Sequence, residues 1–241
     1  MTALNGIRRS LAKPRKRMSP ITPGILQHLI QFPRIHDDTP KSVAVTLEII
    51  RCLYIVLFYS MVRISSLVPN STGSFDRKRQ LTWDNIKMFP DGAVIELVLT
   101  KTIQNCNRTH QIALAASPES PFCPVAALHR IANIRGERPP GDPVFAIPAM
   151  GGWAPLSRYQ VDTVLTMQIE KAGLDPKLYK FHSFRRGAIQ LAILLEPKLH
   201  LIRLQSDHSS TAFEAYTNLP AESRFSLTSM MINGTAAQAN H

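Results

Sequence analysis

Two short strings in the C-terminal part of the chain contain side chains that act on phosphate groups. FHSFRRGA holds His182 and Arg185 three residues apart, and LQSDHSSTAFEAY holds His208 and Tyr216 eight residues apart. A phenol is a nucleophile, an imidazole moves protons near neutral pH, and a guanidinium makes paired hydrogen bonds to phosphate oxygens. Breaking and rejoining a phosphodiester without a metal needs such groups around one phosphate.

The same chemistry needs another cation on the phosphate and a proton donor for the leaving sugar oxygen. Arg63 follows a long apolar stretch, and Lys101 lies in LTKTIQ between two β-rich segments. Each residue alone has a plainer explanation: Arg63 as a cap on helix carbonyls, Lys101 as a solvated turn lysine, and Tyr216 as a core aromatic. The occurrence of all six groups in one chain favours a phosphate site.

The apolar patterns predict the elements that must position these groups. A short helix is expected from Pro23, and a long core helix over 40–62, with Thr39 before it and Pro40 at its first position, brings the chain to Arg63. VIELVLTKT and RTHQIALA are expected to form a hairpin with Lys101 at its tip. A helix follows over about 125–134.

Further helices are expected in the second half of the chain. Ser157 and Gln160 form a capping box for a helix that ends at Gly173. FHSFRRGAIQLAILL predicts a helix with apolar residues inward, and a shorter helix and a last helix bearing Tyr216 follow it. The inward residues of the first are Ile189, Ala192 and Ile193; the shorter helix contains Leu199, Ile202 and Leu204; Thr211 and Glu214 resemble a capping box for the last. The expected fold is mostly α with a small antiparallel β-sheet, an α+β fold.

Charge and composition favour a polyanionic partner. The 241 residues carry 28 Lys and Arg against 17 Asp and Glu, a net charge of +11. The apolar run over 52–62 is shorter than the roughly 20 residues that cross a bilayer, so no membrane span is expected. Three cysteines without a CxxC pair predict neither a disulfide framework nor a zinc site. The basic N-terminal segment binds phosphates, is a nuclear address or is a solvated arm; its cations are Arg8, Arg9, Lys13, Arg15, Lys16 and Arg17.

The order of the six groups resembles the tyrosine recombinase family. That family has an arginine, a hairpin lysine, a histidine-x-x-arginine pair, a second histidine or tryptophan, and a tyrosine. The matching positions are Arg63, Lys101, His182, Arg185, His208 and Tyr216. The resemblance extends from about Gly6 to Arg224 and includes LTWDNI and FCPVAAL. The spacing of eight residues before the tyrosine, the HSFRRG string and the LQ-x-D-x-SS phrase are most similar to crypton-type transposon recombinases.

Three positions depart from the family pattern. Ser66 stands where many members have an acidic residue, Ser206 where crypton-type enzymes usually have glycine, and His208 where they usually have tryptophan. Histidine is the other residue that the family accepts at the last of these positions.

The resemblance implies a catalytic role for each residue of the site. Arg63 and Arg185 would hold the non-bridging phosphate oxygens, and Lys101 would protonate the leaving 5′-oxygen. His182 would help to deprotonate Tyr216, and His208 would bind the phosphate. Tyr216 would form a 3′-phosphotyrosyl link that a second strand resolves, with no cofactor and no metal. Arg186 and the basic N-terminal residues are expected to contact DNA.

The resemblance also implies an organisation for the chain. Residues 1–18 would be a basic linker or the remnant of an N-terminal DNA-binding clamp domain, 19–224 the catalytic domain and 225–241 a tail. The expected partners are double-stranded DNA and further copies in a tetramer on DNA, with no membrane. The expected compartment is the nucleus in a eukaryote and the cytoplasm otherwise.

Two other functions remain open. Type IB topoisomerases share much of this constellation and only nick and reseal one strand. A domesticated or truncated protein would use the basic surface for DNA binding without cleavage. A basic scaffold with no DNA role is disfavoured by the ordered motifs.

Overall fold

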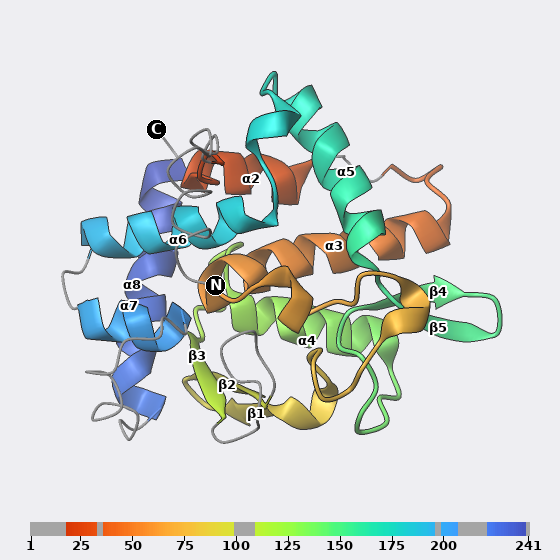
Figure 1. Ribbon diagram of the computed structural model, residues 1–241, viewed down its shortest axis with the longest axis horizontal. Coiled ribbons are helices and arrows are strands. Elements are labelled where there is room, and N and C mark those ends of the chain that lie inside the picture. Colours follow the sequence, from red (N-terminus) through yellow and green to blue (C-terminus); the bar gives the residue numbers. More distant parts are fainter. Residues whose placement is uncertain (1–17, 33–35, 99–108, 196–198, 207–220, 240–241) are drawn as a thin grey trace, which may run out of the picture.

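A long central helix, α3 (Lys41–Ser60), organises the core of the computed structural model, which describes residues 18–32, 36–98, 109–195, 199–206 and 221–239. Figure 1 shows α3 crossing the middle of the molecule, and every residue from Ile49 to Ser60 except Arg51 is buried. By length and composition α3 would be able to cross a membrane, but this buried half lies inside the protein core.

The start of α3 differs slightly from the prediction. Pro40 is the residue before the helix and makes no side-chain cap, so the helix begins at Lys41. The hydroxyl oxygen of Thr39 accepts a hydrogen bond from the backbone N–H of His36 in the preceding turn, so Thr39 stabilises that turn and not the helix end.

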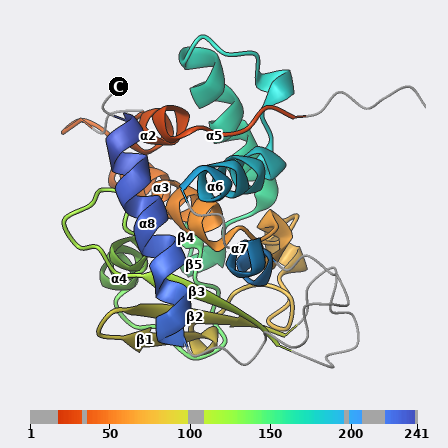
Figure 2. The ribbon, with the colours of Figure 1, turned by 90° about the vertical axis from the view of Figure 1, so that its left-hand side faces the viewer.

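The other helices cover α3 and one another. α3 contacts α2, α4 and α6, and α8 contacts α2, α6, α7 and strand β3. Figure 2 shows α8 running across the ends of these elements. The bounds are α2 Pro23–Gln31, α4 Pro124–Arg135, α5 Arg158–Lys171, α6 Phe181–Leu195, α7 Leu199–Ser206 and α8 Ala221–Ala239, with 3₁₀ turns η1 Ile64–Ser66, η2 Thr72–Ser74, η3 Trp83–Asn85 and η4 Pro176–Leu178.

Two small antiparallel sheets complete the fold. The first has the order β1 (Ile86–Phe89), β2 (Gly92–Leu97) and β3 (His110–Ala115), so β3 is an edge strand. The pairing of β2 with β3 confirms the predicted hairpin, whose connection at 99–108 lies outside the described residues. The second sheet pairs β4 (Ala146–Ala149) with β5 (Gly152–Pro155) and was not predicted.

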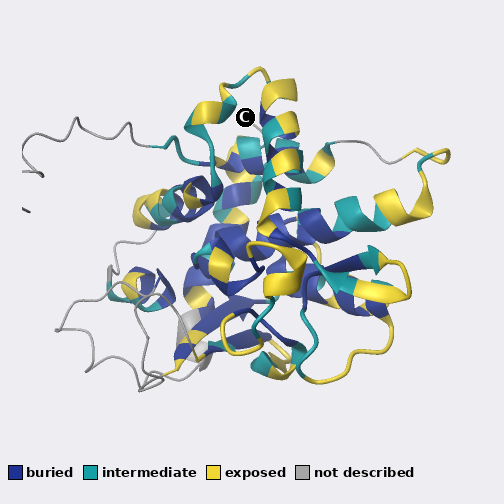
Figure 3. Cartoon of the chain, turned by 45° about the vertical axis from the view of Figure 1, so that its right-hand side comes forward, coloured by how far each residue is buried: buried dark blue, intermediate teal, exposed yellow. Residues whose placement is uncertain are grey.

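Helices α5 and α6 follow most of their predicted patterns. Ser157 and Gln160 form the predicted capping box of α5. On α6, Ala192 is fully buried and Ile189 is half-buried, whereas Ile193 is 49% exposed. The prediction for Ile193 was wrong because consecutive helical residues are about 100° apart, which turns Ile193 away from the buried side. Figure 3 shows this division of α-helices into a buried and an exposed side.

Residues 225–239, which the domain prediction separated as a tail, lie in α8 and pack into the core. Phe225, Leu227, Met231 and Ile232 are buried. The hydroxyl of Tyr59 on α3 donates a 2.9 Å hydrogen bond to Thr235 on α8. The last turns of α8 therefore belong to the same hydrophobic core as α3.

Candidate functional site

A sharp corner at the end of α3 brings the chain to Arg63. Met61 ends the helix in the left-handed conformation, with φ of 55°, and it has the only positive φ of any non-glycine among the described residues. Arg63 then precedes η1 in extended conformation. Its side chain is half-buried and makes no hydrogen bond or ion pair with any described residue, so it does not cap the carbonyls of α3.

The first two turns of α6 supply the predicted histidine and arginine. His182 is exposed, whereas Arg185, one turn later, is only 5% exposed. The Nη1 atom of Arg185 donates a 2.9 Å hydrogen bond to the carbonyl oxygen of Met61. This bond joins the start of α6 to the corner after α3, across 124 residues of sequence.

The two elements are also held together by aromatic packing. Phe184, the neighbour of Arg185, stacks on Tyr54 of α3 with 5.1 Å between ring centroids. Both side chains are fully buried. Stacked aromatic pairs add about 1 kcal/mol to the burial of their area. The backbone positions that carry Arg63 and Arg185 are therefore set by a rigid part of the core.

His182 experiences the charge of the surrounding arginines. Partial burial lowers the pKa of its imidazole, and Arg185, Arg63 and Arg186 lower the pKa further because each disfavours a second positive charge. The arginine after α3 and the two arginines on α6 thus act on the same imidazole. A histidine with a lowered pKa is neutral at pH 7 and able to accept a proton.

Arg186 has a structural contact of its own. Its Nη1 atom donates a 2.8 Å hydrogen bond to the carbonyl oxygen of Met18, and the N–H of Ile21 donates to the carbonyl of Ser183. A Cβ atom on Gly187 would lie 1.8 Å from the carbonyl oxygen of Ile21. The segment that follows the basic N-terminal residues is thus packed directly against the helix of His182 and Arg185.

The remaining predicted site residues lie outside the described part of the chain. These are Lys101, His208, Tyr216 and the basic residues Arg8, Arg9, Lys13, Arg15, Lys16 and Arg17. The described elements on either side are β2 and β3, which flank Lys101, and α7 and α8, which flank His208 and Tyr216. The structure therefore brings together Arg63, His182, Arg185 and Arg186 and does not test the other positions.

Three residues near the site were not identified from the sequence. Met61 shapes the corner, and His110 and Gln205 link β3 to α7 through hydrogen bonds. Gln205 stands in the LQ-x-D-x-SS phrase, which was the one available sign of its importance.

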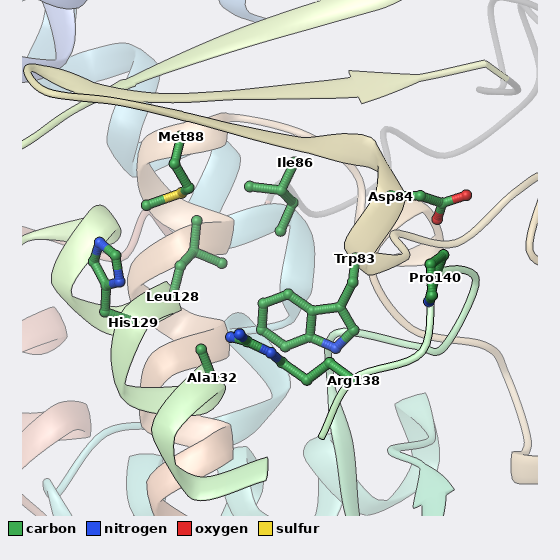
Figure 4. Close-up of a pocket in the computed structure, with 9 residues that line it drawn as sticks. All are labelled: Trp83, Asp84, Ile86, Met88, Leu128, His129, Ala132, Arg138 and Pro140. Carbon is green, nitrogen blue, oxygen red and sulfur yellow. The ribbon is translucent and has the colours of Figure 1, made fainter. Parts of the chain in front are cut away.

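A separate hollow lies between β1 and α4. It has a volume of about 370 Å³ and includes Trp83, Leu128, His129 and Arg138 in its wall. Figure 4 shows the guanidinium of Arg138 beside the indole of Trp83, 5.0 Å from its ring centroid. None of the described residues of the predicted catalytic set lines this hollow.

Comparisons with known proteins identify the fold. No protein-family model and no curated protein sequence matches the chain. The structure of the XerH site-specific recombinase bound to difH substrate, a pre-cleavage complex, matches with a TM-score of 0.55 at 16% identity over 88% of this chain and 53% of that one. An FLP recombinase–Holliday junction complex matches with a TM-score of 0.54 at 13% identity over 93% and 52%, and an Flpe–Holliday junction complex with 0.51 at 12% over 88% and 48%.

These matches confirm the predicted fold class, a mostly helical domain with small antiparallel sheets as in recombinase structures. The chain spans about half the length of the proteins it matches. At 12–16% identity the likeness concerns the fold.

Proposed function

We propose that this chain cleaves and rejoins DNA strands as a tyrosine recombinase, through a 3′-phosphotyrosyl link on Tyr216. The observation that carries the proposal is the convergence of Arg63, His182 and Arg185 from two distant segments onto one corner of the molecule. The fold supports the proposal, since it is shared with recombinases solved on DNA substrate and on Holliday junctions.

The chemistry assigned to the three gathered groups follows from their charge. Two guanidinium groups stabilise the negative charge that builds on the phosphate as the nucleophile attacks, typically by several kcal/mol in a site sheltered from water. The imidazole of His182 accepts the phenolic proton. Partial burial and the neighbouring arginines lower its pKa, so it is neutral at pH 7 and available as a base. Lys101 donates a proton to the leaving 5′-oxygen, and His208 binds the phosphate.

Two of the four described tyrosines are excluded as the nucleophile by their burial. Burial raises the pKa of the Tyr54 and Tyr59 hydroxyls, and each hydroxyl donates a hydrogen bond within the core. Neither can meet a DNA phosphate. Tyr159 and Tyr179 have at least partly accessible side chains. They therefore serve as controls for Tyr216.

The proposed partner is double-stranded DNA, with a tetramer of this chain assembling on two duplexes and a Holliday junction as the intermediate. The net charge of +11 supports a polyanionic partner. We place the chain nearest to crypton-type transposon recombinases, on the HSFRRG string and the eight-residue spacing from His208 to Tyr216. DNA integration or transposition is the corresponding biological reaction.

A covalent-capture experiment tests the proposal. The protein is incubated with 5′-labelled duplexes of randomised sequence that carry a nick, so that the short fragment beyond the cleaved phosphate diffuses away and cannot be rejoined. The expected product is a labelled protein band that survives denaturation and disappears on protease treatment. Tyr216→Phe should abolish it, because the nucleophilic oxygen is absent, while Tyr159→Phe and Tyr179→Phe should retain it.

The outcomes separate the competing functions. A labelled band that persists in Tyr216→Phe would contradict the assignment of the nucleophile. DNA binding without any covalent band in the wild type would favour a non-cleaving DNA-binding protein. Relaxation of supercoiled DNA without strand exchange would favour a topoisomerase.

A further inference from the structure

The outer edge of the three-stranded sheet is closed by a glutamine side chain. Within the described part of the chain, β3 pairs only with β2, and an edge strand leaves backbone N–H and C=O groups without a strand partner. The Oε1 atom of Gln205 accepts a 3.3 Å hydrogen bond from the N–H of Ala113, and its Nε2 atom donates a 2.9 Å bond to the carbonyl of Ala113. The side-chain amide thus pairs with Ala113 as the peptide group of a neighbouring strand would.

The same glutamine reaches two other segments of the chain. Its Nε2 atom also donates a 3.0 Å hydrogen bond to the carbonyl of Tyr59, four residues before Arg63. The backbone carbonyl of Gln205 lies 3.2 Å from Nε2 of His110, the first residue of β3. Because a carbonyl only accepts hydrogen bonds, the His110 ring donates through Nε2.

These contacts join three elements that lie next in sequence to proposed catalytic residues. Tyr59 belongs to the end of α3, which leads to Arg63. His110 begins the strand that follows the segment of Lys101. Gln205 is next to last in α7, three residues before His208. Gln205 is 3% exposed, so water has little access to its hydrogen bonds.

We propose that Gln205 is a positioning residue, which sets the α7 end leading to His208 and Tyr216 against the α3 end leading to Arg63. The inference rests on the proposed function. It goes beyond that function because Gln205 touches no phosphate and acts through the groups that do. A misplacement of about 1 Å at a reacting group is able to reduce a rate about 100-fold. The hydrogen bonds of Gln205 are therefore expected to affect the rate of cleavage as well as the stability of the fold.

A second buried glutamine provides a matched control. Gln168 on α5 is 1% exposed, accepts a 3.0 Å hydrogen bond from the Tyr54 hydroxyl, and donates to the carbonyls of Leu29 and Phe32. It joins α2, α3 and α5 with the same chemistry. Its α3 partner, Tyr54, lies nine residues before Arg63, and none of its partners lies in β3 or α7, the elements that flank Lys101 and His208.

The test compares Gln205→Met with Gln168→Met, in which a side chain of similar length lacks the amide. Three quantities are measured: the thermal midpoint, the amide exchange rate of Ala113 without DNA, and the single-turnover rate of covalent capture on saturating nicked duplexes of randomised sequence. Both variants should lose stability. Only Gln205→Met should expose the Ala113 N–H to faster exchange and reduce the capture rate of folded protein about 10- to 100-fold.

A milder variant covers the case in which Gln205→Met does not fold. His110→Phe keeps a ring at the position and removes the hydrogen bond to the Gln205 carbonyl. It should reduce the capture rate about threefold to tenfold, with unchanged DNA affinity.

The outcomes distinguish this inference from the proposed function. If the wild type forms a covalent complex and Gln205→Met and His110→Phe form it equally fast, the positioning role is overturned and the proposed function stands. If Gln168→Met slows capture as much as Gln205→Met, general destabilisation explains both, and the positioning role is again overturned. If the wild type forms no complex, both proposals are lost.

Discussion

Two buried arginines, Arg135 and Arg185, have different surroundings in this protein. Arg135 at the end of α4 is 8% exposed and Arg185 on α6 is 5% exposed. Arg135 pairs with Asp142 at 2.8 Å and stacks on Trp153, 4.7 Å from the ring centroid. Arg185 donates to a backbone carbonyl and lies beside His182 within a group of cations that includes Arg63.

The two arginines differ in whether a carboxylate of the described residues is seen to balance the positive charge. At Arg135 a carboxylate of the protein compensates much of the cost of burial, although desolvation still lowers the pKa of Arg135. Around His182 the arginines lower a neighbouring pKa, and Arg63 forms no ion pair with any described residue. Arg135 has its counter-charge within the protein, although its Nε and Nη1 atoms find no hydrogen-bond partner among the described residues. The cations around His182 are suited to receive an anion.

Removing one of the arginines near His182 should give the largest effect on the rate of covalent capture. Arg63→Met is expected to reduce the single-turnover rate of covalent capture about 100- to 1,000-fold, because a stabiliser of the transition-state charge is lost. The free energy of unfolding should change by less than about 0.5 kcal/mol, since Arg63 is half-buried and unpaired among the described residues. Capture rates and denaturant unfolding curves measured on the same preparations would check this prediction. A large loss of stability with a normal capture rate would show that Arg63 has a structural role and not a catalytic one.

The opposite result is expected at the paired arginine. Asp142→Ala leaves the Arg135 guanidinium, whose side chain is 3% exposed, without its carboxylate. The expected loss of unfolding free energy is about 2 kcal/mol, below the full cost for a buried pair because Asp142 is partly exposed. Capture by the folded protein should stay within about twofold of the wild type. If Asp142→Ala reduced the capture rate as much as Arg63→Met does, the Arg135–Asp142 pair and the site around His182 would be energetically coupled.

A pH titration sharpens the comparison at His182. Its NMR signal in the wild type should titrate below the usual histidine pKa, and Arg63→Met should raise that pKa because one repelling cation is gone. Since the folded pKa lies below the unfolded one, His182 adds stability at neutral pH that is lost as the pH falls from about 6.5 through the folded pKa. An unchanged pKa in Arg63→Met would show that Arg63 does not act on His182.

The smallest expected effect is on the salt dependence of DNA binding. A protein that neutralises several phosphates loses affinity steeply as salt rises. Removing one phosphate contact with Arg63→Met should reduce the slope of log K against log salt by about 0.9, whereas Asp142→Ala should leave the slope unchanged. Fluorescence anisotropy on a fixed duplex across a salt series would measure both slopes, and equal slopes for wild type and Arg63→Met would place Arg63 away from the phosphates.

Local patterns predicted the elements that carry the site but not the contacts between them. The helix α6 and the capping box at Ser157 are encoded within a few residues of sequence, and both were confirmed, although Ile193 on α6 lies outward. Gln205 bonds to Ala113, 92 residues away, and no local pattern reports such a pairing. The short strands β4 and β5 have only four residues each, too few for a strong alternation.

The corner at Met61 places two opposing demands on one position. The left-handed backbone favours glycine, since other residues are strained there by about 1 kcal/mol, whereas the fully buried side chain fills space that glycine would leave empty. Few amino acids satisfy both demands. Position 61 should therefore tolerate far fewer replacements than Val62, even though its own side chain takes no part in the chemistry.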